Sequence, residues 1–352
     1  AGVLVAWLAV LRPGMALWLN QPVVAWLLIL VTLAHGAWGL RCLATLRARA
    51  PSPAPQPEPL APGAGGHGAL FFLSGAAALV YEVVFAKSLA LTFGSTALAM
   101  NTVLMTYMGG MAIGAWLGGR MAERARRPLH VYGVIEIAIG AFCALAPALQ
   151  APLQSLYVYL AEGTPADAPT LTLLRIALGA LILAPPTVLM GMTLPLATRH
   201  LGASGQLGPT VGFLYAANTG GAALGAIAGG YWLLPTLGTS ASVRMAALAS
   251  IVGGLLALRW SRAAGDAAAP VALTMDQPEL PQLASRLALA GLFLSGAVAL
   301  AFEVQTTHLL AIIAGNSTYA FALMVGTFLV GASLGGGLSS RLLAGGAHPI
   351  AL

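Results

Sequence analysis

The residues of this sequence most suited to chemistry are ionisable side chains placed inside long apolar runs. Glu82 lies in one such run, and Glu303 lies in a second run 221 residues further along the chain. Each acid is followed five residues later by a basic or titratable group, Lys87 in the first run and His308 in the second. Carboxylates in apolar surroundings bind cations, carry protons or pair with other polar groups, because an isolated charge there is costly.

Two interpretations of these acids stand side by side. In the functional one, Glu82 and Glu303 face each other near the middle of a membrane and bind a cation or carry a proton. In the structural one, each carboxyl is neutral or paired and fixes the packing of its helix. Five residues turn a helix by about 500°, so Glu82 and Lys87 point in different directions, and Lys87 is expected to reach outward. His308 is either a proton carrier or a packed neutral imidazole.

Other polar residues in the apolar runs are open to the same two interpretations. Asn218 lies within an apolar helix and either lines a cavity or bonds across helices. Glu136 follows Arg126 and Arg127 closely in the chain. We interpret it as a partner of these arginines at the membrane interface, because a carboxylate there stays close to water and to positive charge.

The composition identifies lipid as the solvent of this chain. Of its 352 residues, 59% are hydrophobic and only 7% are charged, whereas an ordinary soluble domain has about 25% charged residues. The mean hydropathy is +0.87. Continuous apolar runs exclude a membrane β-barrel, whose strands alternate apolar and polar residues.

The charge and the reactive residues exclude several functions. The net charge of +6 comes from basic residues at the ends of apolar runs rather than from one patch, so nucleic-acid binding is not expected. The Cys and His residues show no metal-ligand spacing, and no nucleophile stands beside a base. The sequence therefore predicts no metal, no other cofactor and no catalytic constellation.

The stretch that carries Glu82 recurs as a whole. Residues 73–120 match residues 294–341 at a constant offset of 221, so that Arg120 corresponds to Arg341. The match includes an acid, a helix break and a basic helix end, which low complexity alone does not supply. We interpret it as an internal repeat of a membrane protein, and an even number of spans between the copies makes the repeat parallel.

Glycine spacing predicts where helices come close. Gly110, Gly114 and Gly118 recur at intervals of four residues, and the same interval separates Gly221, Gly225 and Gly229. Small residues at this spacing let two helix backbones approach each other.

Apolar runs and Pro/Gly-rich stretches divide the chain into segments. An apolar run of about 20 residues spans a bilayer as a helix, and Pro-rich stretches act as linkers. In chain order we expect N-terminal membrane helices at 1–50, a Pro/Gly-rich linker at 51–68, a first six-helix repeat unit at 69–259, a cytoplasmic connector at 260–286, and the start of a second repeat unit at 287–352, with two helices and apparently truncated.

The distribution of Arg residues predicts the orientation. The loops at 94–97, 151–168, 235–240 and 314–317 carry no Lys or Arg, and 151–168 carries Glu162 and Asp167 instead. By the positive-inside rule, the Arg-rich loops are cytoplasmic in a bacterial-type inner membrane, with many membrane passes. The basic residues of those loops are Arg41, Arg47, Arg49, Arg120, Arg124, Arg126, Arg127, Arg199, Arg259, Arg262, Arg286 and Arg341.

The loop GGRMAERARRPL at 118–129 is the most specific local motif. It resembles the loop between the second and third helices of major facilitator transporters. The resemblance implies that an acid and several arginines hold two helices in one conformational state. Those residues are here Glu123, Arg124, Arg126 and Arg127, with Glu123-Arg124 where an Asp-Arg pair is usual.

Four stretches together resemble the membrane part of spermidine-synthase-like proteins, the fused major facilitator/spermidine synthase family: FLSGAAALVYEVV, the FGST break, GGRMAERARRPLHVYGVIE and LYAANTGGAALGA. The resemblance covers most of residues 69–341. It implies a parallel-repeat helical bundle, often attached to a soluble aminopropyltransferase-like domain. This sequence contains no Gly-rich nucleotide loop and no α/β stretch, so aminopropyl transfer is assigned to none of its residues.

The expected fold is all-α: a polytopic transmembrane helical bundle, major-facilitator-like, with a parallel internal repeat. Three functions follow. The first is a transporter of a small cationic solute, such as a polyamine, with Glu82 and Glu303 as its polar centre. The second is a non-catalytic membrane subunit or scaffold of a larger complex, with other membrane subunits as partners besides the lipid bilayer. The third is the membrane part of an aminopropyltransferase-like protein whose catalytic domain lies outside these residues.

Overall fold

The computed structural model describes residues 64–93, 97–165, 168–201, 207–263 and 318–344, with a few single residues between 286 and 297. Within this part of the chain the regular structure is helical, without strands, which confirms the all-α fold class. Residues 1–50, most of the linker and connector, and both Glu303 and His308 lie outside the described residues.

Helices α4 to α9 follow one another with short connections, and α11 comes after residues 264–317. They are α4 (Ala64–Phe93), α5 (Ala97–Arg124), α6 (Pro128–Ala161), α7 (Pro169–Leu201), α8 (Leu207–Ala228), the π-helical turn η2 (Gly229–Leu233), α9 (Leu234–Ala263) and α11 (Thr318–Ala344). Helix α6 starts where Pro128 occupies its first turn, a position that needs no backbone donor. Gly238 lies inside α9 with φ 73°, a left-handed conformation that glycine adopts without steric cost.

Five segments of the described chain are long and apolar enough to cross a bilayer, namely Gly65–Phe93, Pro128–Ala161, Pro169–Leu201, Val211–Arg262 and Thr318–Gly337. Large apolar side chains such as Leu145, Leu181 and Leu248 point outward from these segments and are exposed. Water penalises such a surface, whereas lipid covers it without cost. The protein is therefore an integral membrane protein.

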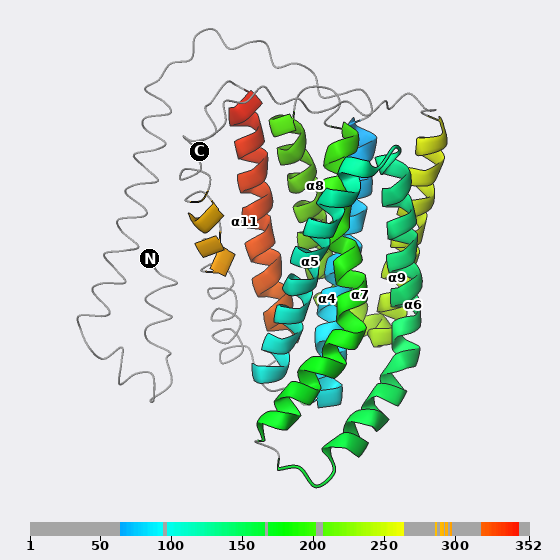
Figure 1. Ribbon diagram of the computed structural model, residues 1–352, viewed down its shortest axis with the longest axis vertical. Coiled ribbons are helices and arrows are strands. Elements are labelled where there is room, and N and C mark those ends of the chain that lie inside the picture. Colours follow the sequence, from blue (N-terminus) through cyan, green and yellow to red (C-terminus); the bar gives the residue numbers. More distant parts are fainter. Residues whose placement is uncertain are drawn as a thin grey trace, which may run out of the picture. The chain divides into compact units, whose positions relative to one another are not determined.

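Helices α4 to α9 lie side by side with their axes along one common direction (Figure 1). The closest pairs are α5 with α7, α6 with α9, and α4 with α8, and the next closest are α6 with α7 and α4 with α9. Exchanging α4 with α7, α5 with α8 and α6 with α9 turns α5–α7 into α4–α8 and α6–α7 into α4–α9, and it leaves α6–α9 unchanged. Because α4 and α7 run in opposite directions, this pairing has the form of an inverted repeat.

The predicted parallel repeat is tested only at α11. Helix α11 begins at Thr318, which is 221 residues after the first residue of α5, Ala97, and it ends one residue before the position that corresponds to Arg124. The helix bounds therefore agree with the sequence register. The other helix expected in the second unit lies almost wholly outside the described residues, so the duplicated hairpin stays a prediction.

Glycine places the helix backbones in direct contact in each of the closest pairs. A Cβ on Gly114 would overlap the Val188 carbonyl oxygen of α7, and one on Gly225 would overlap the Ala76 carbonyl oxygen of α4. In the third pair, a Cβ on Gly133 would lie 2.7 Å from the carbonyl oxygen of Gly254 on α9. The glycine spacings at 110–118 and 221–229 do lie at helix contacts.

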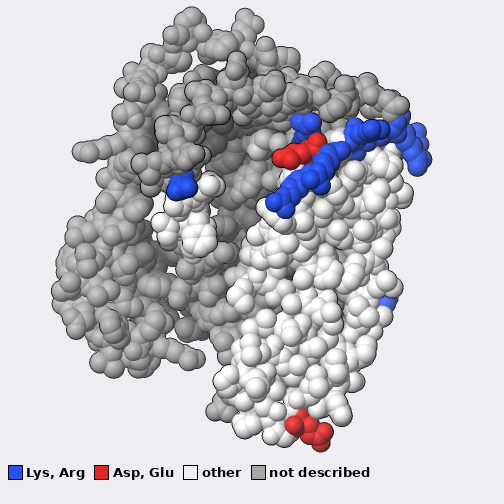
Figure 2. Space-filling view, in the orientation of Figure 1, with Lys and Arg blue, Asp and Glu red and all other residues white. Residues whose placement is uncertain are grey.

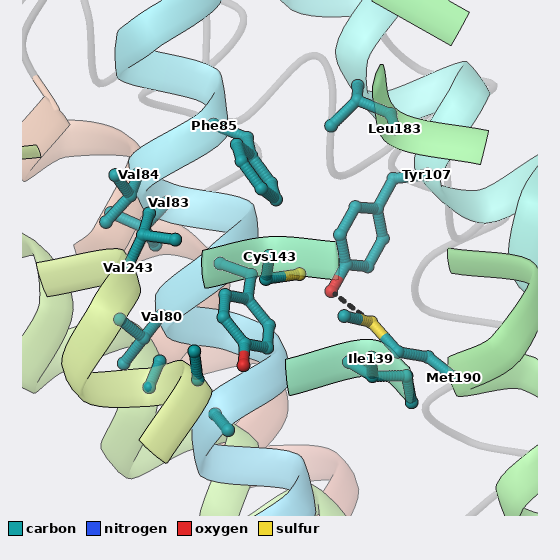
Figure 3. Packing of buried hydrophobic residues seen from close by; sticks show 14 of the residues in the cluster. Val80, Val83, Val84, Phe85, Tyr107, Ile139, Cys143, Leu183, Met190 and Val243 are labelled. Atoms are coloured by element: carbon teal, nitrogen blue, oxygen red, sulfur yellow. Dashed lines mark hydrogen bonds between the residues drawn. The ribbon is translucent and has the colours of Figure 1, made fainter. Parts of the chain in front are cut away.

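The interior between these pairs is filled by apolar and aromatic side chains. Tyr107 of α5 and Leu183 and Met190 of α7 point towards Phe85 of α4 and Cys143 of α6 (Figure 3). The Tyr107 hydroxyl donates to the Ala78 carbonyl oxygen at 2.7 Å and lies 3.3 Å from the Met190 sulfur. Its polar end is thus satisfied inside the core, as buried tyrosines require.

Charged side chains gather at the ends of the bundle, and its broad middle is almost free of them (Figure 2). One end carries Arg126 and Arg127 between α5 and α6 and Arg262 in the last turn of α9, and the opposite end carries the loop with Glu162. Arg120 stacks on Trp116 with its guanidinium carbon 3.8 Å from the ring centroid, an arrangement typical of the membrane–water interface.

Candidate functional site

A buried carboxyl on α6 is the centre of the polar interior. The Glu136 side chain is 2% exposed, and the Ser74 hydroxyl of α4 donates a short hydrogen bond to its Oε1. Ser250 of α9 lies close enough to this carboxyl to interact with it. Three helices that are distant in the sequence therefore supply groups to one carboxyl.

The interpretation of Glu136 as an interfacial partner of Arg126 and Arg127 is wrong. Both arginines are exposed, whereas Glu136 is buried and accepts a hydrogen bond from the Ser74 hydroxyl. Helix α6 begins at Pro128, so Glu136 lies roughly 12 Å along the helix axis from that end, at 1.5 Å per residue. It also lies on the face that packs on α4 and α9, because Gly133 and Gly140 on either side of it contact α9.

Two tyrosines extend this polar group, and we call the set Ser74, Tyr81, Tyr132, Glu136 and Ser250 the Glu136 cluster. The Tyr81 hydroxyl donates to the Ser250 oxygen at 3.3 Å. The Tyr132 hydroxyl is close enough to Glu136 to interact electrostatically, without the geometry of a hydrogen bond. Its ring stacks on Phe71 of α4 with centroids 5.2 Å apart, which fixes its position beside the carboxyl.

Glu82 is the second buried carboxyl, 2% exposed on α4. It follows Tyr81 directly, so the two side chains point about 100° apart around the helix. The Tyr81 side chain belongs to the Glu136 cluster, whereas the Glu82 side chain interacts electrostatically with Tyr107 of α5. The proposed partner of Glu82, Glu303, lies outside the described residues, and so does His308; the facing pair of acids stays a prediction.

The other predicted residues lie apart from the two carboxyls. Lys87 is exposed on α4, in agreement with its expected outward direction. Asn218 is half-buried at the contact of α8 with α4, where a Cβ on Gly75 would lie 3.0 Å from the Asn218 Oδ1. This position favours the cross-helix interpretation of Asn218 over the cavity-lining one.

The loop with Glu123, Arg124, Arg126 and Arg127 joins α5 to α6 at the Arg-rich end, and all of these side chains are exposed. Its backbone is ordered by hydrogen bonds, including Ala125 N–H to the Met121 oxygen at 2.9 Å and His130 N–H to the Arg127 oxygen at 3.1 Å. The role of the loop in holding one conformational state stays a prediction.

A group of rings at the Arg-rich end was not foreseen from the sequence. His67 of α4 lies with its ring centroid 5.0 Å from that of His200 on α7 and 5.6 Å from the Trp260 ring on α9. The two histidines are far apart in the chain, and no local spacing indicates their contact. In the described part of the chain no three or more His, Cys, Asp or Glu residues form a group suited to a metal ion.

Comparisons of the chain with protein-family models, with curated protein sequences and with solved structures gave no match. The function is therefore inferred from the geometry of the bundle. Two carboxyls lie inside an apolar bundle, one beside a tyrosine of α5 and one within a cluster of hydroxyls. Such groups can accept and release protons or stabilise a positive charge that enters the bundle.

Proposed function

We propose that this protein is a transporter-like membrane bundle that moves a small cationic solute, such as a polyamine, and that Glu82 is part of its polar centre. The observation that carries the proposal is the burial of Glu82 and Glu136 inside a bundle whose outer surface is apolar. Charged groups at membrane depth are costly and mark pathways for ions, protons or charged substrates.

The sign of the buried charge supports a cationic solute. Glu82 and Glu136, the two buried residues described above that carry a charge when ionised at neutral pH, are both acids. The described basic residues named above lie at helix ends or are exposed. A cation that enters such a bundle gains Coulomb energy from the carboxylates, and the gain is larger than in water because the dielectric constant is lower.

The pairing of helices supports alternating access. The sets α4–α6 and α7–α9, which correspond to each other in this pairing, can rock against each other around a central site, as the halves of transporters built from inverted repeats do. We further propose that the Arg-rich end faces the cytoplasm of a bacterial-type inner membrane, because basic loops are retained on that side.

The test is uptake by proteoliposomes that contain the purified chain. Labelled spermidine and labelled tetraethylammonium serve as cationic probes, and labelled glucose serves as a neutral control. We expect uptake of at least one cation, none of glucose, and loss of uptake in Glu82→Gln. The matched control is Glu162→Gln, an exposed acid in a loop, which should transport normally. A wild type without cation uptake would contradict the proposal and favour a membrane subunit or scaffold.

A further inference from the structure

The environment of Glu136 restricts what this carboxyl can bind. It is 2% exposed, and α6 meets the α9 backbone at Gly133 and Gly140 on either side of it, where added Cβ atoms would lie 2.7 Å from carbonyl oxygens of α9. Helices in such close contact leave little room for a hydrated ion beside the carboxyl.

The groups that face Glu136 can donate hydrogen bonds but carry no positive charge. They are Ser74 and Tyr81 from α4, Tyr132 and Cys143 from α6, and Ser250 from α9. Helix α7 also packs on α6, and its charged side chains Arg175, Arg199 and His200 lie towards its two ends.

An ionised carboxylate in this place has hydrogen bonds but no counter-charge among these groups. Moving an ion of this size into an apolar medium costs several kcal/mol even after the surroundings relax. Addition of a proton removes this cost, and the hydroxyls of Ser74 and Ser250 can each rotate to donate or to accept. The site therefore accommodates both forms of the carboxyl without a change of fold.

We propose that Glu136 is a proton-binding site in the interior of the bundle. The carboxylate accepts a proton to form the acid, and on release the O–H electron pair stays on the carboxylate while the proton passes to water. Release requires water to reach Glu136, which follows when α9 moves away from α6. This inference deepens the proposed function, on which it rests for its physiological role, because it names the proton as the coupled ion.

Infrared difference spectroscopy of the whole chain in lipid, between about pH 5 and about pH 8, reads this carboxyl directly. We expect a carboxylic acid C=O band that shifts in heavy water and loses intensity as the pH rises. The band should be absent in Glu136→Gln and unchanged in Glu162→Gln. Ser74→Ala should keep the band but shift its frequency, because one hydrogen bond to the carboxyl is lost.

Three outcomes would overturn the inference. They are a Glu136 carboxyl that is ionised throughout the pH range, one that stays protonated throughout, and one whose band responds to sodium ions rather than to pH. Circular dichroism checks that each variant is folded. If Glu136→Gln does not fold, Ser74→Ala still tests the assignment of the band to Glu136.

The spectroscopic result does not depend on transport. A pH-dependent Glu136 band in a protein that takes up no cation would contradict only the proposed function. Cation uptake without such a band would contradict only the proton site. Where both hold, Glu136→Gln should lose uptake driven by a pH gradient and retain exchange of labelled for unlabelled spermidine.

Discussion

The contact of α5 with α7 and the contact of α6 with α9 are both made by glycines, yet they differ in what lies between the glycines. Gly110 and Gly114 of α5 press on Thr187 and Val188 of α7, and the Thr187 hydroxyl donates to the Leu183 carbonyl of its own helix at 2.8 Å. Gly133 and Gly140 of α6 press on α9 and have Glu136 between them. The first contact is neutral, and the second contains a titratable group.

This difference indicates a division of roles. A contact of glycine with backbone depends on shape alone, so it has one arrangement at every pH. A contact that encloses a carboxyl changes its energy by several kcal/mol when the carboxyl gains or loses a proton. We infer that, of these two contacts, only α6–α9 changes its energy with protonation.

The largest expected effect is at the neutral contact. Gly114→Val places a branched side chain on the Val188 carbonyl oxygen, which is backbone and cannot move aside. Overpacking of this kind costs about 3 kcal/mol or more. We expect the variant to show a strongly lowered thermal midpoint in detergent, measured by circular dichroism, or to be purified only as aggregate.

Gly109→Val is the matched control, because Gly109 has no described atom within 4 Å of an added Cβ. It carries the same change on the same helix and should keep the wild-type midpoint. Equal midpoints for the two variants would show that the close α5–α7 contact is absent in the folded protein.

The next effect is at the titratable contact. Glu136→Leu removes the acceptor of the Ser74 hydroxyl, and loss of the partner of a polar group inside a protein costs about 1–3 kcal/mol. Glu136→Gln keeps an acceptor oxygen and should cost less. Chemical denaturation of both variants measures the difference, and equal losses of stability would show that the hydroxyls do not depend on the carboxyl.

A smaller effect is expected from the tyrosines that adjoin the two contacts. Tyr107→Phe removes the hydrogen bond to the Ala78 carbonyl, which has a length of 2.7 Å, and Tyr81→Phe removes a longer one to Ser250 of 3.3 Å. A typical intramolecular hydrogen bond contributes about 1 kcal/mol. The free energy of unfolding should fall more for Tyr107→Phe, and the reverse order would contradict the described geometry.

The smallest effect is expected at Lys87, which is exposed on α4 outside both contacts. Lys87→Gln should change the free energy of unfolding by less than about 0.5 kcal/mol, as surface substitutions do. It should also leave cation uptake unchanged. A large loss of either would show that Lys87 has a partner inside the bundle.

The helices were predictable because apolar length and glycine spacing are local properties of the sequence. The described helices fall on apolar runs of the sequence, such as α5 at Ala97–Arg124 and α6 at Pro128–Ala161. Helix α6 continues to Ala161 past Pro147 and Pro152, so prolines inside an apolar run do not mark the end of this helix. The burial of Glu82 agrees with its place in the middle of an apolar run.

The composition of the Glu136 cluster was not predictable. The position of Glu136 near Arg127 suggested an interfacial pair, since sequence distance does not show which face of α6 packs on α4 and α9. Ser74 and Ser250 are unremarkable in a sequence rich in small residues, and they become informative only when three helices bring them to one carboxyl. The contact of His67 with His200 arises in the same way.

The π-helical turn Gly229–Leu233 at the end of α8 has a consequence for movement. It holds one residue more per turn than an α-helix, so its conversion to α-helix would rotate the following chain by about 100°. That rotation would withdraw Gly230 from Ala322 and the Tyr231 hydroxyl from the Tyr319 carbonyl oxygen of α11, now 3.3 Å away. The end of α8 can therefore rotate by one residue, and the contacts with α11 set the free-energy cost of that rotation.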